Sequence, residues 1–457
     1  MSYTSINPYT EETLKTFPDA TATDIKVILN KGHEAFLKWR KTSFAERSKI
    51  LHKAASLLKE NLNDYTALMA DEVGKLLHEG EWEITLCANI CDYYADHAEE
   101  ILKPQKIKKL TENEGDSVLY PTPQGIIWAI EPWNVPFFQV FRILAPQIAG
   151  GNVVLLKHAP CVPQCAEMIV KLMREAGLPE GVFQNIYSTN EQTEEILKDQ
   201  RIRGVALTGS TKAGSIVAGI ASKYIKKSTL ELGGADAFIV LEDASLEKAV
   251  QTAVFARHFN AGQICISPKR MIIMDEIYDE FLTRYKAAVK SLKAGDPKDQ
   301  TTTLGPLVSK AALEHLNQQV EEAKKQGVTV ETIGAPVPKK GYFFQPILMT
   351  GLEGKEIRKE EFFGPVTHLY RVKTDQEAID LANESEYGLS GSIQTGDEKR
   401  GIEIAKKIDS GSFSVNGALF TSPNAPFGGV KNSGYGRDLA HDGILEFMNM
   451  KLINIQK

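Results

Sequence analysis

Gly151-Asn152-Val153-Val154-Leu155-Leu156-Lys157 is the stretch that decides the fold, because it begins a run of short apolar segments that alternate with helical ones. Short apolar strands that alternate with helices are typical of a parallel sheet with crossover connections. The sequence therefore predicts an α/β fold whose first sheet is Rossmann-like. We expect its strands at residues 153–156, 184–187 and 205–208, and its helices near residues 162–176 and 190–199.

The segment before this run is predicted to be mostly helical. Residues 23–103 have helical periodicity, and Ser43 with Glu46 forms the pattern of a capping box. Residues 125–130 follow a Pro-Thr-Pro turn, and we expect them to form a strand of the same sheet.

A second alternating region follows, from Ala237 to about Val415, with apolar strands near residues 271–274 and 366–370. The final segment, residues 448–455, has the pattern of an exposed apolar strand. An edge of this kind pairs readily with another chain, so it indicates association between copies.

Length and composition limit the classes of protein that the chain can be. A chain of 457 residues exceeds what one hydrophobic core usually organises, so two or three domains are expected. With 42% hydrophobic and 25% charged residues and a net charge of −6, neither disorder, a membrane protein nor nucleic-acid binding is indicated. The first residues lack a basic segment followed by an apolar run, so we expect a soluble, cytoplasmic protein.

The five cysteines do not form the pattern of a disulfide framework. Cys87 and Cys91 lie one helical turn apart, as do Cys161 and Cys165, and His158 precedes the second pair. A zinc site would require a second pair of ligands at ligand spacing. We therefore expect buried thiols on amphipathic helices and no metal.

The segment Asn260-Ala261-Gly262-Gln263-Ile264-Cys265 carries the strongest chemical signal, together with Glu231 in Leu230-Glu231-Leu232-Gly233-Gly234. Covalent catalysis requires a thiolate and a group that activates it or resolves the intermediate. A single cysteine is weak evidence, because most are small buried hydrophobic residues. A cysteine and a carboxylate on two turns rich in small residues predict a nucleophile and a base.

Four further motifs accompany this pair in a definite order. The whole set resembles the aldehyde dehydrogenase superfamily over nearly the full chain, and it is most similar to the compact bacterial succinate-semialdehyde dehydrogenases. The motifs are Pro132-Trp133-Asn134-Val135-Pro136, Leu207-Thr208-Gly209-Ser210-Thr211, Glu361-Phe362-Phe363-Gly364-Pro365 and Ala425-Pro426-Phe427-Gly428-Gly429.

The resemblance implies a division of the chain into three parts. An NAD(P)-binding domain would comprise residues 1–108 and 124–232, and an α/β catalytic domain with the nucleophilic cysteine would comprise residues 233–435. A small β oligomerisation element would comprise residues 109–123 and 436–457. Such a chain would form a homodimer or a homotetramer.

The nucleotide site is expected at residues 208–211, which follow an apolar strand and precede a helix that contains Gly214. Helix N-termini offer free N–H groups to phosphate at the carboxyl ends of parallel strands. The Gly-x-Gly-x-x-Gly pattern is missing, so taken alone these glycines predict turns. The resemblance implies instead a variant cofactor loop with Gly209, Ser210 and Gly214, in which Lys212 is exposed to solvent.

Other cofactor contacts follow from the resemblance. Lys157 matches the lysine that reaches the adenosine ribose, and Trp133, Glu361 and Phe363 match residues around the nicotinamide and its ribose. NAD-preferring relatives carry a glutamate where this chain has Pro160. A missing carboxylate removes repulsion of a 2′-phosphate, so either NAD or NADP is expected as cofactor and NADP should be used.

For the chemistry, the resemblance implies that Cys265 attacks the aldehyde and that Asn134 stabilises the developing oxyanion together with the Cys265 N–H. Glu231 would then act as general base for hydrolysis of the thioester. Ser267 stands where some relatives have a second cysteine, so a Cys-x-Cys redox switch cannot form.

Asn134, Phe138 and Arg142 are spaced four residues apart and share a face if Pro136 begins a helix. Arg142 would then lie in the substrate funnel, where a guanidinium pairs with a carboxylate at the far end of an aldehyde. Thr421 matches a carboxylate-binding serine of the succinate-semialdehyde enzymes, but Phe259 replaces a second arginine that several of them have. These features predict oxidation of succinate semialdehyde to succinate.

Other functions remain open at this point. A general aliphatic aldehyde dehydrogenase is the nearest alternative. A CoA-acylating or phosphorylating enzyme would usually lack a glutamate at position 231. A thiol hydrolase would require a histidine beside Cys265, and His258 is the nearest. A non-catalytic protein of this fold would have no reason to retain Cys265, Glu231 and Asn134.

Overall fold

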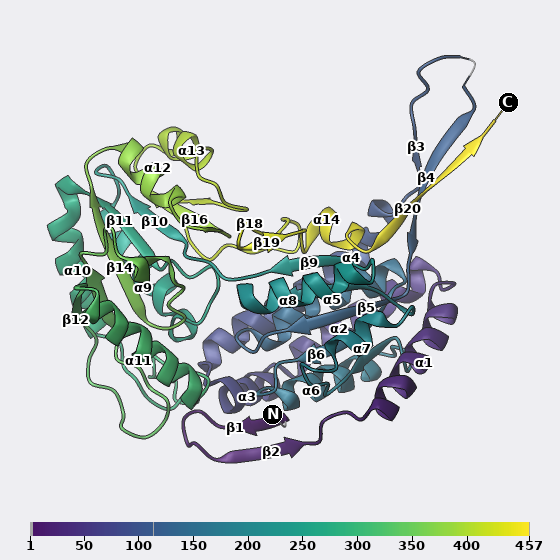
Figure 1. Ribbon diagram of the computed structural model, residues 1–457, viewed down its shortest axis with the longest axis horizontal. Coiled ribbons are helices and arrows are strands. Elements are labelled where there is room, and N and C mark those ends of the chain that lie inside the picture. Colours follow the sequence, from purple (N-terminus) through teal and green to yellow (C-terminus); the bar gives the residue numbers. More distant parts are fainter. Residues whose placement is uncertain (1–2, 113, 457) are drawn as a thin grey trace.

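Two α/β lobes and a projecting arm make up the chain (Figure 1). The computed structural model describes residues 3–112 and 114–456. Each lobe is built on a mainly parallel sheet with helices packed on it, so the predicted α/β class is confirmed.

The sheet of the first lobe has the strand order β19-β9-β8-β5-β6-β7, and all of its neighbouring pairs are parallel except β19 with β9. The predicted alternation of strands and helices is confirmed, although β7 begins one residue earlier and ends two residues earlier than expected. The strands are β5 (Ile126–Glu131), β6 (Val153–His158), β7 (Phe183–Asn185), β8 (Ile202–Thr208), β9 (Lys227–Glu231) and β19 (Gly434–Tyr435).

The helices that cover this sheet come from two parts of the chain, the alternating segment that also supplies the strands and the N-terminal segment. Ser43 and Glu46 form the predicted capping box at the start of α2, where Ser43 Oγ accepts the Glu46 N–H at 3.2 Å. The helices of the alternating segment are α5 (Pro136–Gly150), α6 (Pro163–Glu175), α7 (Thr193–Lys198) and α8 (Thr211–Lys223). The earlier elements are the hairpin β1 (Tyr3–Ile6) and β2 (Thr13–Phe17), then α1 (Ala22–Trp39), α2 (Phe44–Glu60), α3 (Leu62–Val73) and α4 (Leu77–Ile101).

The second lobe has the strand order β12-β13-β14-β11-β10-β16-β17, in which only β12 runs antiparallel to its neighbour. Its strands are β10 (Ala237–Val240), β11 (Arg270–Met274), β12 (Thr329–Thr332), β13 (Ile347–Thr350), β14 (Val366–Val372), β16 (Gly391–Gln394) and β17 (Ser414–Val415). Its helices are α9 (Leu246–His258), α10 (Tyr278–Lys290), α11 (Lys310–Lys325), α12 (Asp375–Asn383) and α13 (Glu398–Ala405), with 3-10 turns at Phe259–Gly262, Asp275–Ile277 and Glu356–Lys359.

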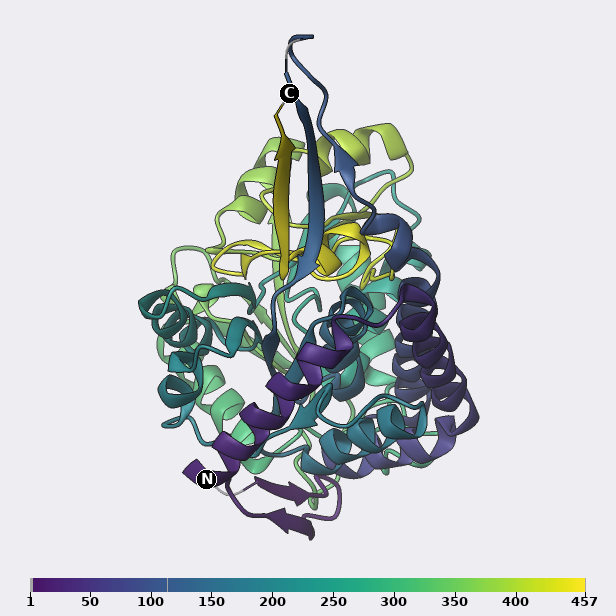
Figure 2. The ribbon, with the colours of Figure 1, turned by 90° about the vertical axis from the view of Figure 1, so that its right-hand side faces the viewer.

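The arm consists of β3 (Gln105–Lys106), β4 (Asp116–Pro123) and β20 (Met448–Ile455). β20 pairs antiparallel with β4 along its whole length, and Figure 2 shows the two strands leaving the lobes side by side. The strand predicted at residues 448–455 is confirmed, and its apolar side chains Leu452, Ile453 and Ile455 are exposed. The sheet also includes β3, which lies inside the range that we expected for the first domain.

Short elements join the lobes near the C-terminus. β15 (Tyr387–Gly388) pairs with β18 (Val430–Lys431), and β19 returns to the edge of the first sheet. α14 (Ala440–Leu445) then packs on α5 before the chain enters the arm. Residue 434 therefore belongs to the first sheet in space, although it follows the second lobe in sequence.

The carboxyl ends of three neighbouring strands meet in one row. Thr208 and Glu231 are partners at the ends of β8 and β9. Glu131, at the end of β5, comes directly after Ile130, whose partner on β8 is Leu207, so Glu131 lies next to Thr208. Ligands bind beyond this edge in open parallel sheets, so the fold places a candidate site there.

Within the described residues, no helix has the length and apolar character required to cross a lipid bilayer.

Candidate active site

The loop between α9 and β11 presents Cys265, and its conformation depends on three consecutive left-handed residues. Asn260, Ala261 and Gly262 have φ values of 51°, 52° and 77°. A Cβ on Gly262 would lie 2.6 Å from the backbone oxygen of Gly364, so a side chain at this position is excluded by both conformation and space. The sharp turn directs the following residues back toward the first lobe.

Arg257 at the end of α9 holds this loop from behind. Its buried guanidinium donates to the Val366 carbonyl at 2.9 Å, to Ser267 Oγ at 2.6 Å and to the Gly262 carbonyl at 3.3 Å. Ser267 Oγ in turn donates to the Ala256 carbonyl at 3.0 Å. Ser267 is therefore a structural residue of the loop that carries Cys265.

Asn134 faces the same space from the first lobe. Its Nδ2 donates to the Gln263 carbonyl at 3.0 Å, and its Oδ1 accepts from Gln139 Nε2 at 3.2 Å. The Asn134 carbonyl also accepts from Asn260 Nδ2 at 2.8 Å. An amide nitrogen has two hydrogens, so one N–H of Asn134 is left for a ligand.

Two buried carboxylates on α4 connect these two pieces. Glu83 accepts the N–H groups of Phe137 and Phe138 at 2.7 and 3.0 Å, at the first turn of α5, and pairs with Lys75. Glu79 accepts the Asn260 N–H at 2.7 Å. Sequence reasoning missed both residues, because acidic side chains one turn apart on a helix ordinarily indicate a solvated face.

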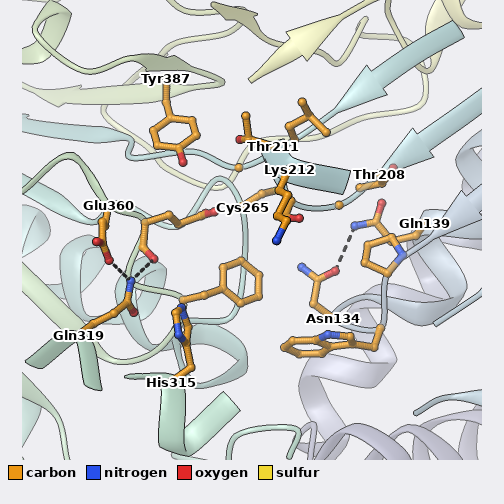
Figure 3. A pocket seen from close by; sticks show the side chains of 18 residues that line it. Asn134, Gln139, Thr208, Thr211, Lys212, Cys265, His315, Gln319, Glu360 and Tyr387 are labelled. Atoms are coloured by element: carbon orange, nitrogen blue, oxygen red, sulfur yellow. Dashed lines mark hydrogen bonds between the residues drawn. The ribbon is translucent and has the colours of Figure 1, made fainter. Parts of the chain in front are cut away.

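Two cavities meet at Cys265. One of about 460 Å³ extends along the first sheet, and one of about 190 Å³ extends between the lobes. Both are lined by Cys265 and Gln139. Figure 3 shows Asn134 and Gln139 on one side of the larger cavity and Glu360 and Tyr387 on the other, with Cys265 between them.

The larger cavity begins at the N-terminus of α8. Ser210 caps this helix by accepting the Ala213 N–H at 3.2 Å, and a Cβ on Gly209 would meet only Leu207 Cδ2, at 3.7 Å. The helix therefore presents N–H groups at a place that a pyrophosphate can approach. Trp133 and Phe363 meet edge to face at 5.7 Å across the other end of the cavity.

Glu361 also lines this cavity, and its carboxylate accepts the Gly234 N–H at 3.1 Å. A phosphate-binding helix end, two aromatic rings and a carboxylate fit a dinucleotide. Lys212 is exposed at the rim. The remaining expected cofactor residues do not line the cavity. Gly214 lies inside α8 against Leu232, and Lys157 is buried beside the Tyr3 ring, 5.9 Å from its centre.

The smaller cavity is lined by a few polar side chains, Arg142 and Thr421 among them, within largely apolar walls. Arg142 lies on α5, as the predicted start of that helix at Pro136 requires, and its guanidinium is only 1% exposed. Thr421 Oγ1 is buried and has no hydrogen-bond partner within the described protein. The walls are aliphatic and aromatic, and the aromatic residues are Trp82, Phe138, Phe255, Phe259 and Phe427.

Glu231 lines neither cavity. Its carboxylate is buried, and neither oxygen has a hydrogen-bond partner in the part of the chain that the structure describes. Burial, and next the Asp438 carboxylate, raise its pKa well above the usual range, while Arg142 and Arg437 oppose the rise. The structure thus brings Cys265 and Asn134 together, but places the Glu231 carboxylate beside Arg142.

The thiol of Cys265 lies in an environment that favours its neutral form. Burial raises its pKa to about 11, and Lys269 and Arg142 oppose the rise. Lys269 Nζ donates to the Cys265 carbonyl at 2.5 Å and lies 3.0 Å from Glu361 Oε1, so it joins the thiol loop to the wall of the larger cavity. Sequence reasoning also missed this lysine, since only the folded loop places it beneath the cysteine.

The other thiols and His158 do not form a ligand set. Cys87, Cys91 and Cys165 are buried. His158 Nε2 lies 3.0 Å from the Pro136 carbonyl, and Nδ1 lies 3.0 Å from the Ala159 N–H, so both ring nitrogens have backbone partners. Burial lowers the pKa of this histidine to about 4, and it is neutral at pH 7.

Alkylation of Cys265 by iodoacetamide in the cofactor-free protein should accelerate about tenfold per pH unit from pH 6 to 9.5 without a plateau. The reason is that the thiolate is the reactive form and the pKa lies above this range. Replacing Lys269 with Met should slow alkylation at each pH, because a charge that favours the thiolate is removed. A plateau below pH 8 in the unaltered protein would contradict the assigned environment. The Cys265→Ala variant measures the labelling of the other thiols.

Comparisons with known proteins point to one family. The model of the Aldehyde dehydrogenase family matches residues 1–453. The NADP(+) succinate-semialdehyde dehydrogenase of Deinococcus radiodurans is 38% identical over 99% of this chain and 94% of its own length. An aldehyde dehydrogenase of Paenarthrobacter nicotinovorans is 39% identical over 99% of both chains.

A solved structure leads to the same family. The succinic semialdehyde dehydrogenase of Streptococcus pyogenes, in complex with NADP+ as the cofactor, superposes with a TM-score of 0.96 and 38% identity over the whole of both chains. A family match that covers almost every residue and relatives aligned from end to end leave one assignment. The chain belongs to the aldehyde dehydrogenase family.

Proposed function

We propose that the chain oxidises succinate semialdehyde to succinate, with NADP or NAD as the hydride acceptor. Family membership makes it an NAD(P)-dependent aldehyde dehydrogenase. The observation that carries the choice of substrate is the pairing of Arg142 and Thr421 in the cavity that also contains Cys265. The relatives from Deinococcus radiodurans and Streptococcus pyogenes support the same choice.

Cys265 would act as the nucleophile, because it lies where the two cavities meet. Its thiolate adds to the aldehyde carbon, and the carbonyl oxygen becomes an oxyanion in a thiohemiacetal. The free N–H of Asn134 and the Cys265 backbone N–H are the donors that we assign to this oxyanion. Such a donor contributes about 10²–10³ in rate when it is held in place in advance. The bonds from Gln139 and to Gln263 hold the Asn134 amide in this way.

The larger cavity would hold the nicotinamide cofactor, which accepts the hydride when it is bound. Gly209, Ser210 and the N-terminus of α8 would bind its phosphates, and Glu361 its nicotinamide ribose. Trp133 and Phe363 would pack near the ring. We assign Lys157 and Gly214 to the more distant adenosine half, Gly214 through its packing of α8 against Leu232.

Glu231 would act as the general base that activates water to hydrolyse the thioester. Its carboxylate has to rotate from its place beside Arg142 toward Cys265 for this step. The raised pKa of this carboxyl makes it a stronger base once it has lost its proton.

Replacing Glu231 with Gln should preserve one rapid burst of reduced cofactor per site and then stop turnover, because hydride transfer precedes hydrolysis. Replacing Cys265 with Ala should abolish both the burst and turnover while cofactor still binds. Rapid-mixing absorbance at 340 nm measures the burst. Burst and steady-state rate that fall together in Glu231→Gln would instead place the glutamate in activation of the thiol.

Cofactor preference depends on the end of β6. Pro160 stands where a carboxylate would repel the 2′-phosphate of NADP, and its carbonyl accepts the Thr4 N–H at 2.9 Å, which fixes the local chain. The Deinococcus radiodurans relative is named as an NADP(+) enzyme, and the Streptococcus pyogenes structure contains NADP+ as the cofactor. These observations support use of NADP by this chain.

NADP should be used at least as well as NAD, and Pro160→Glu should shift the ratio of kcat/KM toward NAD by about tenfold or more through charge repulsion. Pro160→Gln is the matched control, since it changes the backbone residue without adding charge, and should shift the ratio much less. Steady-state kinetics with both cofactors measures the effect. A preference of the unaltered enzyme for NAD above about 100-fold, or about 2.7 kcal/mol, would show that another acidic group guards the ribose.

The smaller cavity supports a substrate with one carboxylate and a short apolar stem. The Arg142 Nη2 donates to Thr208 Oγ1 at 2.5 Å, and the side chain lines the cavity, so we assign the remaining N–H groups of its guanidinium to a ligand. Thr421 Oγ1 offers a second donor that lacks a protein partner. Phe259 occupies the place of the second arginine of several relatives, so Arg142 would carry the charge recognition alone.

Replacing Arg142 with Lys should lower kcat/KM for succinate semialdehyde at least tenfold and that for butanal less than threefold, because a lysine keeps the charge but lacks the planar fork. Lysine is preferable to alanine here, because loss of the cation would also disturb Glu231. Thr421→Val, which is nearly isosteric, should raise KM for the semialdehyde alone. Equal losses for both aldehydes would make the enzyme a general aliphatic aldehyde dehydrogenase, which the aromatic walls also suit.

We also propose that copies of the chain associate through the arm. β20 lies at the edge of the arm sheet, and its side chains Leu452, Ile453 and Ile455 are exposed. A strand with one unpaired edge and apolar side chains binds another strand readily. A homodimer or a homotetramer would bury this surface.

A further inference from the structure

Glu131 is a buried acid next to the proposed site that the mechanism does not use. It ends β5, and its backbone partner on β6 is His158. Its side chain is 2% exposed, and neither carboxyl oxygen has a hydrogen-bond partner within the described protein. A buried polar group without a partner is costly, so it requires a physical explanation.

The strand register gives Glu131 its neighbours. Thr208 and Glu231 are paired on β8 and β9, and Glu131 and Thr208 follow on the pair Ile130–Leu207. Paired residues of parallel strands point to the same face of a sheet. Glu131, Thr208 and Glu231 therefore form one row on the face that α5 covers.

Arg142 lies over this row. Its Nη2 donates to Thr208 Oγ1 at 2.5 Å, and its Nε lies 3.1 Å from Asp438 Oδ2, close enough for an ion pair but off the line of a hydrogen bond. Thr208 Oγ1 accepts this hydrogen bond and keeps its own O–H, which lies close enough to Glu131 to oppose the rise in the pKa of that carboxyl. A single guanidinium thus lies among the carboxyls of Glu131, Glu231 and Asp438.

The charges of this group do not balance when every acid is ionised. Arg142 and Arg437 are the cations that act on Glu231, and Glu131, Glu231 and Asp438 are three acids. Arg437 has other partners as well, because it donates to the Gly429 and Gly436 carbonyls. An uncompensated buried charge costs several kcal/mol in effective terms, about enough to make one acid keep its proton. Within the described protein, neither Glu131 nor Glu231 has a direct ion pair, but Arg142 is the one cation that acts on Glu131, whereas Arg142 and Arg437 both act on Glu231.

We propose that Glu131 is a positioning residue that sets substrate selectivity through Arg142, because its carboxyl has to be neutral for Arg142 to accept a substrate carboxylate. An ionised Glu131 would be a second anion for the same guanidinium, and it would weaken the attraction of Arg142 for a charged aldehyde. A neutral aldehyde would not be affected. This inference rests on the proposed use of a carboxylated substrate.

The surroundings support a proton on Glu131. Burial raises its pKa well above the usual range; Arg142 and Thr208 oppose the rise, and Asp438 adds to it. The pKa of Asp438 is raised only to about 6, because burial raises it while its partner Arg142 opposes the rise. His158 on β6 is neutral at pH 7, and Tyr94 on α4 donates its O–H to the Ala440 carbonyl, so neither supplies a charge.

The proposal separates charged from neutral substrates as pH changes. As pH rises and Glu131 loses its proton, kcat/KM for succinate semialdehyde should fall relative to that for butanal. The chemical roles of Cys265 and Glu231 in the reaction affect both aldehydes alike and cancel in the ratio of the two values. Glu231 and Asp438 also act on Arg142, so their ionisation contributes to the fall in both the unaltered enzyme and Glu131→Gln, and the part of the fall that the variant removes belongs to Glu131. The semialdehyde is an anion throughout the range, so its own ionisation does not contribute.

The test is this ratio between pH 6 and 10 in the unaltered enzyme and in Glu131→Gln. The ratio should fall at least tenfold in the unaltered enzyme, chiefly through KM, and several-fold less in the variant, whose amide cannot ionise. Glu72→Gln is the matched control. It removes another buried carboxyl, one that accepts the Gln164 and Cys165 N–H groups away from both cavities, and should retain the unaltered profile.

Thermal unfolding gives a second readout that does not depend on the substrate. A carboxyl that keeps its proton in the folded chain and loses it on unfolding makes stability fall as pH rises above its usual pKa near 4.5. The Tm of Glu131→Gln relative to the unaltered protein should therefore increase from pH 5 to pH 8. A constant difference in Tm would mean that Glu131 is ionised in the folded protein and would overturn the proposal.

The outcomes separate this inference from the proposed function. If the unaltered enzyme at pH 6 does not prefer succinate semialdehyde to butanal, the proposed substrate is wrong, and the Tm series still decides whether Glu131 holds a proton. If the preference is present but its pH profile is flat, or is the same in Glu131→Gln, the role of Glu131 is refuted alone. A flattened profile in Glu72→Gln would also refute it, because the effect would then be common to buried acids.

Discussion

Two carboxylates on α4, Glu79 and Glu83, set the separation between the two halves of the site. Glu83 binds the first turn of α5, which follows Asn134, and Glu79 binds the backbone N–H of Asn260 in the loop that leads to Cys265. Both acids are buried, and their cost is offset by backbone N–H donors and by the ion pair of Glu83 with Lys75. One helix of the first lobe therefore controls the geometry of a loop that belongs to the second.

The same balance of burial against local partners recurs throughout the site. Cys265, Glu131, Glu231 and Asp438 all have raised pKa values because they are removed from water, and Arg142 opposes the rise in each case. Arg142 is thus one cation that interacts with several acidic groups of the site. A guanidinium suits this position, since it keeps its charge in every protonation state of its neighbours.

Much of the fold could be predicted from local pattern. The β-strands predicted at 153–156, 205–208 and 448–455 and the start of α5 at Pro136 depend on alternation, length and a helix-starting proline, which a single sequence contains, although β6 ends two residues later and β8 begins three residues earlier than predicted. Motif order also predicted that Cys265 and Asn134 would meet. Glu131 and Asp438 were missed because they lie about 300 residues apart and acquire meaning only through strand register. The orientation of Glu231 away from Cys265 was equally invisible, because no pattern specifies a side-chain rotamer.

The pairing of β4 with β20 has a consequence for how the chain is made. More than 300 residues separate the two strands, and β19, at the edge of the first sheet, also comes from the last part of the chain. A ribosome therefore releases β4 long before its partner exists, and the first lobe stays incomplete until the second has been synthesised. The emerging chain has to keep an apolar strand from aggregating throughout that interval. Removal of residues 448–455 would leave this edge of β4 without its partner permanently.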